Sequence, residues 1–236
     1  MEINEYSIVM KKIYDLILEF IESVDDDDEN FANLIYYIQN QQIFENPDKI
    51  HEIMIIINKI SKNHSRQNNL IQKTEKILNH YKDQIKQTFS NFQIFNFFKH
   101  NKKVLLFLIQ QQMVTIDDEI LHKFILNEKY IDYKFYFFNE IKDKISNEMK
   151  KSIEEEMDSN KNPQIDDDKL SISENDNYIC SLIRQDSIND FISNLTRMNI
   201  SPNGQIPHSI YETNHFLMQN KNTSLIEYAS FFGSMQ

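Results

Sequence analysis

Apolar residues recur at intervals of three and four along most of the chain, which is the spacing of one face of an α-helix. The pattern is clearest in three successive segments, residues 3–24, 31–43 and 50–60. The acidic run Asp25–Glu29 separates the first two. Asn46-Pro47 precedes the third and is typical of a helix start, with Asn46 as the cap and Pro47 at the first helical position. These segments predict three amphipathic helices.

The next segment, Arg66–Phe89, predicts a longer helix whose apolar or small residues lie close to a seven-residue repeat: Leu70, Thr74, Ile77, Tyr81, Ile85 and Phe89. Such a repeat is typical of a short coiled coil and also of the inner face of a bundled helix. Because the repeat is brief, we expect packing inside a helical bundle. The alternative is that this helix pairs with its copy in a second chain, which would make the protein a self-assembling structural protein.

Further helical spacing predicts an all-α fold, either a bundle or a solenoid, with helix pairs toward the C-terminus. Short helices are expected at 92–98, 103–110 and 119–126, with a cap at Thr115–Asp118, and the charged second half of 130–156 is expected to be an exposed helix. Residues 158–176 are polar, acidic and without periodicity, which predicts a flexible linker in which Ser171 and Ser173 are candidate phosphorylation sites. The expected organisation is a helical N-terminal region (1–157), this linker (158–176) and helix pairs (177–236).

Composition narrows the function classes. The 236 residues include two glycines and four prolines, too few for the tight turns of an all-β or Rossmann-like fold. A net charge of −11 disfavours nucleic-acid and anionic membrane partners, and the local basic run Lys99–Lys103 is interpreted as a solvated helix end. One cysteine, no secretory signal and no long apolar run predict an intracellular, cytoplasmic protein that does not bind membranes.

Two C-terminal segments can be aligned with an offset of 47 residues, from Ile179 to Ile226. Each has apolar or small residues on a short helix, followed by a tight turn that begins with Asp186 in the first copy and Gly233 in the second. The first copy continues as an outer helix through Leu195. Because a two-helix unit cannot bury its apolar surface alone, such units stack into solenoids.

The second copy, SLIEYASFFGSMQ, resembles the first helix and turn of divergent ankyrin repeats, in particular those of Asn/Ile-rich protist proteins. Against the pattern Thr-Pro-Leu-His-x-Ala-Ala-x-x-Gly-His, the matching positions are Ser224, Ile226, Ala229 and Gly233, whereas Leu225, Glu227 and Ser230 depart from Pro, His and the second Ala. Residues 92–124 also resemble the variable helical region that precedes the repeat array in those proteins.

This resemblance implies a non-catalytic scaffold that binds a protein partner, with weak self-association as a further expectation. Since ankyrin repeats are about 33 residues long, it also implies an insertion within 199–222 and a last repeat that continues beyond the chain. The inner helices and loops would bind the partner, and Phe231 and Phe232 are the candidate contact residues; the alternative is that they pack against a following helix. An unfinished last repeat would expose Leu225, Ile226 and Ala229.

No motif predicts catalysis, a cofactor or a metal site. Glu119/His122 and Glu212/His215 have the Glu-x-x-His spacing of di-iron bundles, but the further glutamates that such a site needs are missing, so both are interpreted as surface acid–base pairs. The acidic run at 25–30 lacks the Gly and Glu of an EF-hand, and His51-Glu52 lacks the second histidine of a zincin. Cys180 lies in an apolar stripe and is expected to be a buried thiol.

Overall fold

The computed structural model describes residues 3–23, 28–63, 69–126, 132–159, 174–214, 216–217, 220 and 222–233. These residues form helices and no strand, with one isolated antiparallel bridge between Gln205 and Ser224. The prediction of an all-α fold is confirmed for this part of the chain. The described residues divide into two compact units: those within 1–99 and 107–115 form unit 1, and those within 100–106 and 116–236 form unit 2.

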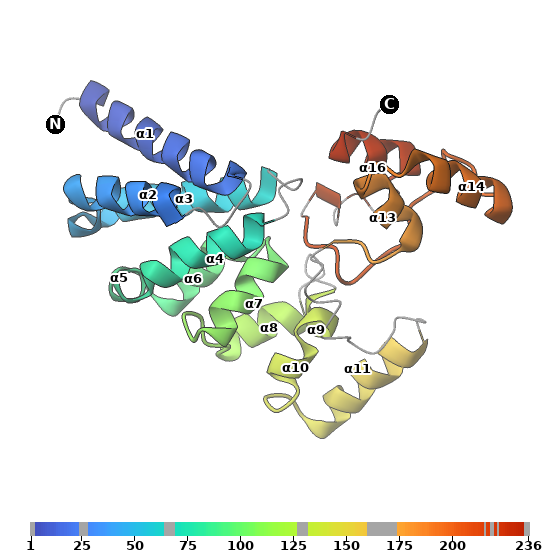
Figure 1. The fold of residues 1–236 in the computed structure, drawn as a ribbon. Helices are drawn as coiled ribbons and strands as arrows, with labels where there is room; N and C mark the ends of the chain where they lie inside the picture. Colours follow the sequence, from blue (N-terminus) through green and yellow to red (C-terminus); the bar gives the residue numbers. More distant parts are fainter. Residues whose placement is uncertain are drawn as a thin grey trace. The chain divides into compact units, whose positions relative to one another are not determined.

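Unit 1 contains the N-terminal helices (Figure 1): α1 (Ile3–Glu22), α2 (Asp28–Asn40), the 3₁₀ turn η1 (Ile43–Glu45), α3 (Pro47–Asn63), α4 (Leu70–His80), α5 (Lys82–Thr88) and α6 (Asn91–Phe98). The helix α7 (Lys102–Gln110) is divided between the two units. Helix α1 packs against α2, α3 and α4, and its residues Ile13, Ile17 and Phe20 are fully buried. The predicted apolar stripe of residues 3–24 therefore forms a central part of this core.

The predicted start of α3 is confirmed. The side-chain oxygen Oδ1 of Asn46 accepts hydrogen bonds from the backbone N–H groups of Asp48 (2.9 Å) and Lys49 (3.3 Å). These are two of the N–H groups that a helix leaves without an internal partner at its first turn. Pro47 follows at the first helical position, where its missing N–H costs nothing.

A buried lysine joins α4 to the end of α1. The Nζ atom of Lys73 donates to the carbonyl oxygens of Phe20 (2.8 Å) and Ser23 (2.6 Å) and to the hydroxyl of Ser23 (2.7 Å). An ammonium group has three N–H donors, so all three are satisfied here. The carbonyl groups at the end of a helix also carry partial negative charge, which favours a cation at this position.

The segment predicted as one long helix, Arg66–Phe89, is interrupted. Tyr81 has φ −103° and ψ 17°, which separates α4 from α5, and residues 64–68 lie outside the described part. All six positions of the predicted seven-residue repeat are buried within unit 1. These positions therefore pack inside unit 1 as expected, whereas the prediction of one longer helix was wrong. The break at Tyr81 lets Phe89 contact Phe97 of α6, with ring centroids 5.2 Å apart.

Unit 2 contains the start of α7 and the later helices: α8 (Asp118–Leu126), α9 (Tyr133–Tyr136), α10 (Phe138–Ile141), α11 (Asn147–Ser159), α13 (Tyr178–Arg184), α14 (Ile188–Met198) and α16 (Leu225–Phe232). The predicted cap before α8 is Asp117, which accepts a hydrogen bond from Ile120 N at 3.0 Å. Helix α9 packs against α8, α10 and α11. Aromatic rings fill this part of the core, where Phe124 and Phe137 stack with centroids 4.6 Å apart.

The compact units divide the chain at a different place from the predicted boundaries at 157 and 177. The predicted linker also needs correction at both ends: Asp158 belongs to α11, and Asn175 is buried in unit 2 beside Glu174 and Asp176. Composition alone predicted flexibility because it does not show which polar groups have buried partners. Residues 160–173, with Ser171 and Ser173, lie outside the described residues.

The two aligned C-terminal helices begin at equivalent positions and are followed by turns at equivalent positions. Helix α13 follows Asn177, whose side chain accepts from Ile179 N at 3.0 Å, and α16 follows Ser224, 47 residues later, whose hydroxyl accepts from Glu227 N at 3.2 Å. The turns after the helices contain Asp186 (φ 52°) and Gly233 (φ 62°), again 47 residues apart. Both residues adopt the left-handed conformation that terminates many helices.

Candidate functional site

Helices α13 and α16 share one apolar core, together with Leu195 of α14 and Leu217. Helix α13 contributes Cys180 and Ile183, and α16 contributes Leu225, Tyr228 and Phe232. With the 47-residue offset, the three α16 positions correspond to 178, 181 and 185 of α13. At about 100° per residue, these positions lie on the side of α13 opposite to Cys180 and Ile183. The two aligned helices therefore pack against each other through different faces. Helix α13 uses the face of Cys180 and Ile183, and α16 uses the opposite face, which carries Leu225, Tyr228 and Phe232.

The face of α16 that corresponds to the buried face of α13 is turned to solvent. Its residues Ile226, Glu227 and Ser230 are exposed, whereas their equivalents Ile179, Cys180 and Ile183 are buried or partly buried. The expectation for this end of the chain was correct for Ile226 and wrong for Leu225, which is buried, while Ala229 is partly buried. Leu225 was misassigned because the sequence did not show which face of α16 meets α13.

Exposed apolar side chains are concentrated in this region. The described residues include ten large hydrophobic side chains that are exposed, and six of them lie between 178 and 226. Three are on α14, where Ile188 is 40% exposed, Ile192 55% and Met198 60%. Leu195 of the same helix is buried in the shared core, so α14 is fixed by one side and presents apolar groups beside it.

The two candidate contact residues have different environments. Phe232 is buried, with its ring 4.8 Å from that of Tyr228 and 5.1 Å from that of Phe231, which corrects its assignment as a surface contact. It fills the core between α13 and α16, which the sequence pattern did not reveal. Phe231 is partly exposed and stacks on the exposed Phe216, with centroids 5.8 Å apart and planes at 6°. Phe216 was missed because it lies in a segment without helical periodicity.

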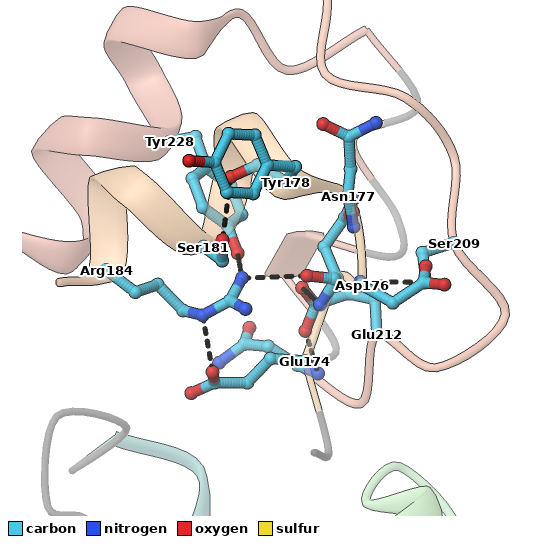
Figure 2. Close-up of polar contacts among 11 residues, drawn as sticks. Glu174, Asp176, Asn177, Tyr178, Ser181, Arg184, Ser209, Glu212 and Tyr228 are labelled. Carbon is cyan, nitrogen blue, oxygen red and sulfur yellow. Dashed lines mark hydrogen bonds and ion pairs between the residues drawn. The ribbon is translucent and has the colours of Figure 1, made fainter. Parts of the chain in front are cut away.

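A network of polar side chains fastens α13 to α16 and to the segment that precedes α13 (Figure 2). The Nη1 amino group of Arg184, which carries two N–H donors, donates to the hydroxyl of Tyr228 (2.7 Å) and to the carbonyl oxygen of Asn175 (2.9 Å). The Nε atom forms an ion pair with Glu174. A planar guanidinium can bind several acceptors at fixed angles, so Arg184 connects three segments with one side chain.

The same network holds the loop of residues 207–214. The side-chain amide of Asn175 donates to Pro207 O at 2.7 Å, and the hydroxyl of Ser209 donates to Asp176 at 2.8 Å. The carboxylate of Glu212 accepts from the backbone N–H groups of Asn175 (3.3 Å) and Asn214 (2.8 Å). Glu212 is buried, so its interpretation as part of a surface acid–base pair was wrong; a single sequence does not reveal that two backbone N–H groups converge on it.

A second buried charge, Lys102, lies near Glu212 in unit 2. Its Nζ atom donates to Ile210 O at 2.6 Å and lies 5.0 Å from the centre of the Tyr136 ring. Burial lowers the pKa of Lys102 to about 8, opposed by the charges of Asp132 and Glu212. Burial raises the pKa of Glu212 to about 7, opposed by its two backbone hydrogen bonds and by Lys102, whereas Glu174 adds to the rise.

The basic run Lys99–Lys103 is therefore not simply a solvated helix end. Asn101 and Lys102 are both buried, and Asn101 caps α7 by accepting from Val104 N at 3.2 Å. Sequence reasoning failed here because a lysine beside other basic residues is normally exposed, and its hydrogen-bond acceptor, Ile210 O, lies 108 residues away in the chain. The signal that could have found it is the position of Lys102 at the start of the apolar helix α7.

The remaining candidate chemistry finds no assembled site among the described residues. Glu119 and His122 are exposed on α8, His215 lies outside the described part, and no described group of three or more His, Cys, Asp or Glu residues could hold a metal ion. Cys180 is buried as predicted, and burial raises the pKa of its thiol to about 12. A thiol that stays protonated is a poor nucleophile.

Comparison with known proteins gives no match. No family model, no curated protein sequence and no solved structure matches this chain. Among the described helices, none combines the length and the apolar character needed to cross a bilayer. The ankyrin resemblance therefore rests on the residues of this chain alone.

Proposed function

We propose that this chain is a non-catalytic protein-binding scaffold of ankyrin type and that α14 carries the main contact with the partner. The observation that supports this proposal best is the concentration of exposed apolar side chains between residues 178 and 226. Large apolar patches on a soluble protein are costly unless a partner covers them, and they are common at the centre of protein interfaces. Ile188 and Ile192 lie one helical turn apart and form one continuous strip.

The packing of α13 and α16 supports the solenoid part of the proposal. Two helices with equivalent caps and equivalent left-handed turns meet through opposite faces, which is the relation between neighbouring units of a stack. The loop between them supports the same interpretation. Gly204 O accepts from Leu225 N at 2.9 Å, and Ile206 N donates to Thr223 O at 2.9 Å. The segment that follows α14 is therefore bonded directly to the start of α16.

The self-assembly alternative receives no such support from its own residues. Leu70, Ile77 and Ile85, on which pairing with a second chain would depend, are buried within unit 1. Exposing them to another chain would open that core. A catalytic role for Glu212 or Lys102 would likewise require access to side chains that are buried and already hydrogen-bonded to backbone groups.

The proposal is tested with a charge placed on α14. The wild-type chain is immobilised, proteins that it retains from an extract of its own cells are identified by mass spectrometry, and each is purified and titrated by calorimetry. We expect Ile192→Asp to weaken a true partner's affinity about tenfold or more, since burial of one isoleucine contributes roughly 2 kcal/mol. The matched control is Ile8→Asp, which changes a residue of similar exposure (61% against 55% for Ile192) on α1 of unit 1.

Both variants should keep the helical circular dichroism and the unfolding midpoint of the wild type, because both side chains are exposed. The control should also keep the wild-type affinity. The proposal fails if no purified protein binds the wild type at micromolar concentration, or if Ile192→Asp binds every retained protein as tightly as the control does.

A further inference from the structure

The segment between α14 and α16 contains the one Asn-Gly sequence of the chain. There are two glycines in all, and of these Gly204 follows Asn203 whereas Gly233 follows Phe232. Asparagine before glycine is the pair most prone to spontaneous deamidation, because a residue without Cβ lets its backbone nitrogen reach the preceding side chain. We propose that Asn203 is a self-modification site whose deamidation is controlled by the contact between its loop and helix α16.

The reaction needs only the chain and water. The backbone nitrogen of Gly204 loses its proton and attacks Cγ of Asn203, the Cγ–Nδ2 bond breaks, and the amide nitrogen leaves as ammonia. The resulting succinimide then adds water at one of its two carbonyl groups. Opening at one carbonyl gives aspartate, and opening at the other gives isoaspartate, in which the backbone runs through the former side chain.

The folded structure restrains this attack. The nitrogen that must attack, Gly204 N, donates a 2.7 Å hydrogen bond to Ser201 O across the turn Ser201-Pro202-Asn203-Gly204. Pro at the second position and Gly at the fourth are typical of a type I turn, and the closed turn engages Gly204 N in this hydrogen bond. Asn203 itself is exposed, so water and base have free access once the turn opens.

The start of α16 and the residue before it hold this turn closed. Gly204 O accepts from Leu225 N, the first residue of α16, at 2.9 Å, and Gln205 and Ser224 form the adjacent bridge. The fit is close, since a Cβ on Gly204 would lie 2.8 Å from Ser201 O. Isoaspartate at 203 lengthens the backbone by one carbon atom, and the turn then cannot return Gly204 O to Leu225 N. Deamidated Asn203 is therefore a permanent chemical mark of chains in which α16 has separated from this loop.

The experiment follows Asn203 by peptide mapping at neutral pH and body temperature, where deamidation adds one dalton and electron-transfer fragmentation separates isoaspartate from aspartate. The full chain is incubated folded and, in parallel, unfolded in guanidinium chloride. We expect deamidation of Asn203 to be about tenfold slower or more in the folded chain. Equal rates in the two states, or no deamidation in the unfolded chain, would overturn the proposal.

A matched pair of variants isolates the contact with α16. Leu225→Ala and Leu225→Pro both shorten the buried side chain, but only proline removes the N–H that donates to Gly204 O, and proline is well tolerated at the first position of a helix. We expect Asn203 to deamidate about fivefold faster in Leu225→Pro than in Leu225→Ala, the factor of one net hydrogen bond. Equal rates in these two variants would show that α16 does not control the site.

Discussion

Replacing Glu212 by glutamine should change the pH dependence of stability in unit 2. The folded chain holds the pKa of Glu212 at about 7, against an ordinary value of 4.5. Because the folded state binds this proton more tightly than the unfolded state, the stabilising contribution is fully present below pH 4.5 and is lost as the pH rises through about 7. Glutamine mimics the neutral form at every pH, so Glu212→Gln should not show this loss.

The size of the effect follows from the difference between the two pKa values. A difference of 7 − 4.5 = 2.5 corresponds to on the order of 3 kcal/mol, since one pKa unit is about 1.4 kcal/mol. Glutamine has one acceptor oxygen, so it leaves either Asn175 N or Asn214 N without its bond, which costs about 1–2 kcal/mol at every pH. We therefore expect Glu212→Gln to be less stable than the wild type near pH 4.5 and equal or more stable near pH 8.

The assay must report on unit 2 alone, because two compact units need not unfold together. Amide hydrogen exchange at Ser181 and Gln185 in α13, whose bonds do not involve Glu212, is measured by NMR between pH 4.5 and pH 8 and corrected for the intrinsic rate, which gives the local opening free energy. The control is Glu119→Gln, an exposed carboxylate on α8 of the same unit, which should leave that free energy unchanged.

One result would refute this reasoning. If the difference between wild type and Glu212→Gln stays constant within about 0.5 kcal/mol over this pH range, Glu212 titrates as it does in the unfolded chain. The carboxylate would then be hydrated in solution, and the network around Asn175 and Lys102 would not enclose it.

Three further substitutions test the hydrogen bonds of Arg184 and Lys73, the two cations that join helices within each unit. Arg184→Gln should destabilise unit 2 by about 3 kcal/mol, because it leaves the partly buried carboxylate of Glu174 without its cation. Tyr228→Phe removes one hydrogen bond and should destabilise unit 2 by only about 1 kcal/mol. Hydrogen exchange in α13 measures both effects, and equal effects would contradict the central role of the guanidinium. Lys73→Met should destabilise unit 1 by about 1–3 kcal/mol in chemical denaturation, since three acceptors at the end of α1 lose their donor, and the exposed Lys59→Met is the control that should show no change.

The features that sequence predicted well are those set by neighbouring residues. Asn46-Pro47 starts a helix because the cap and the N–H groups that it binds are within three positions of each other. The left-handed turn at Gly233 is similarly local. Helical periodicity also located most of the buried face of α1, since it depends only on the spacing of apolar residues.

The features that sequence did not predict depend on contacts between distant residues. Lys102 looked like one of several solvated cations, because its bond to Ile210 O joins residues 108 positions apart. The break at Tyr81 and the inward orientation of Phe232 depend likewise on which neighbouring helix lies opposite. The sequence could not show which apolar residues of α14 are exposed. Leu195 and Ile192 belong to one apolar stripe, but Leu195 is buried and Ile192 is exposed.

The different faces that α13 and α16 use against each other have a consequence for substitutions. Cys180 and Ile183 pack in one core with Leu225, Tyr228 and Phe232 of α16. The positions 47 residues after Cys180 and Ile183 are Glu227 and Ser230, which are exposed. A polar substitution that would disrupt the core from α13 is therefore tolerated at the aligned position of α16, so the two helices need not share side chains to keep this packing.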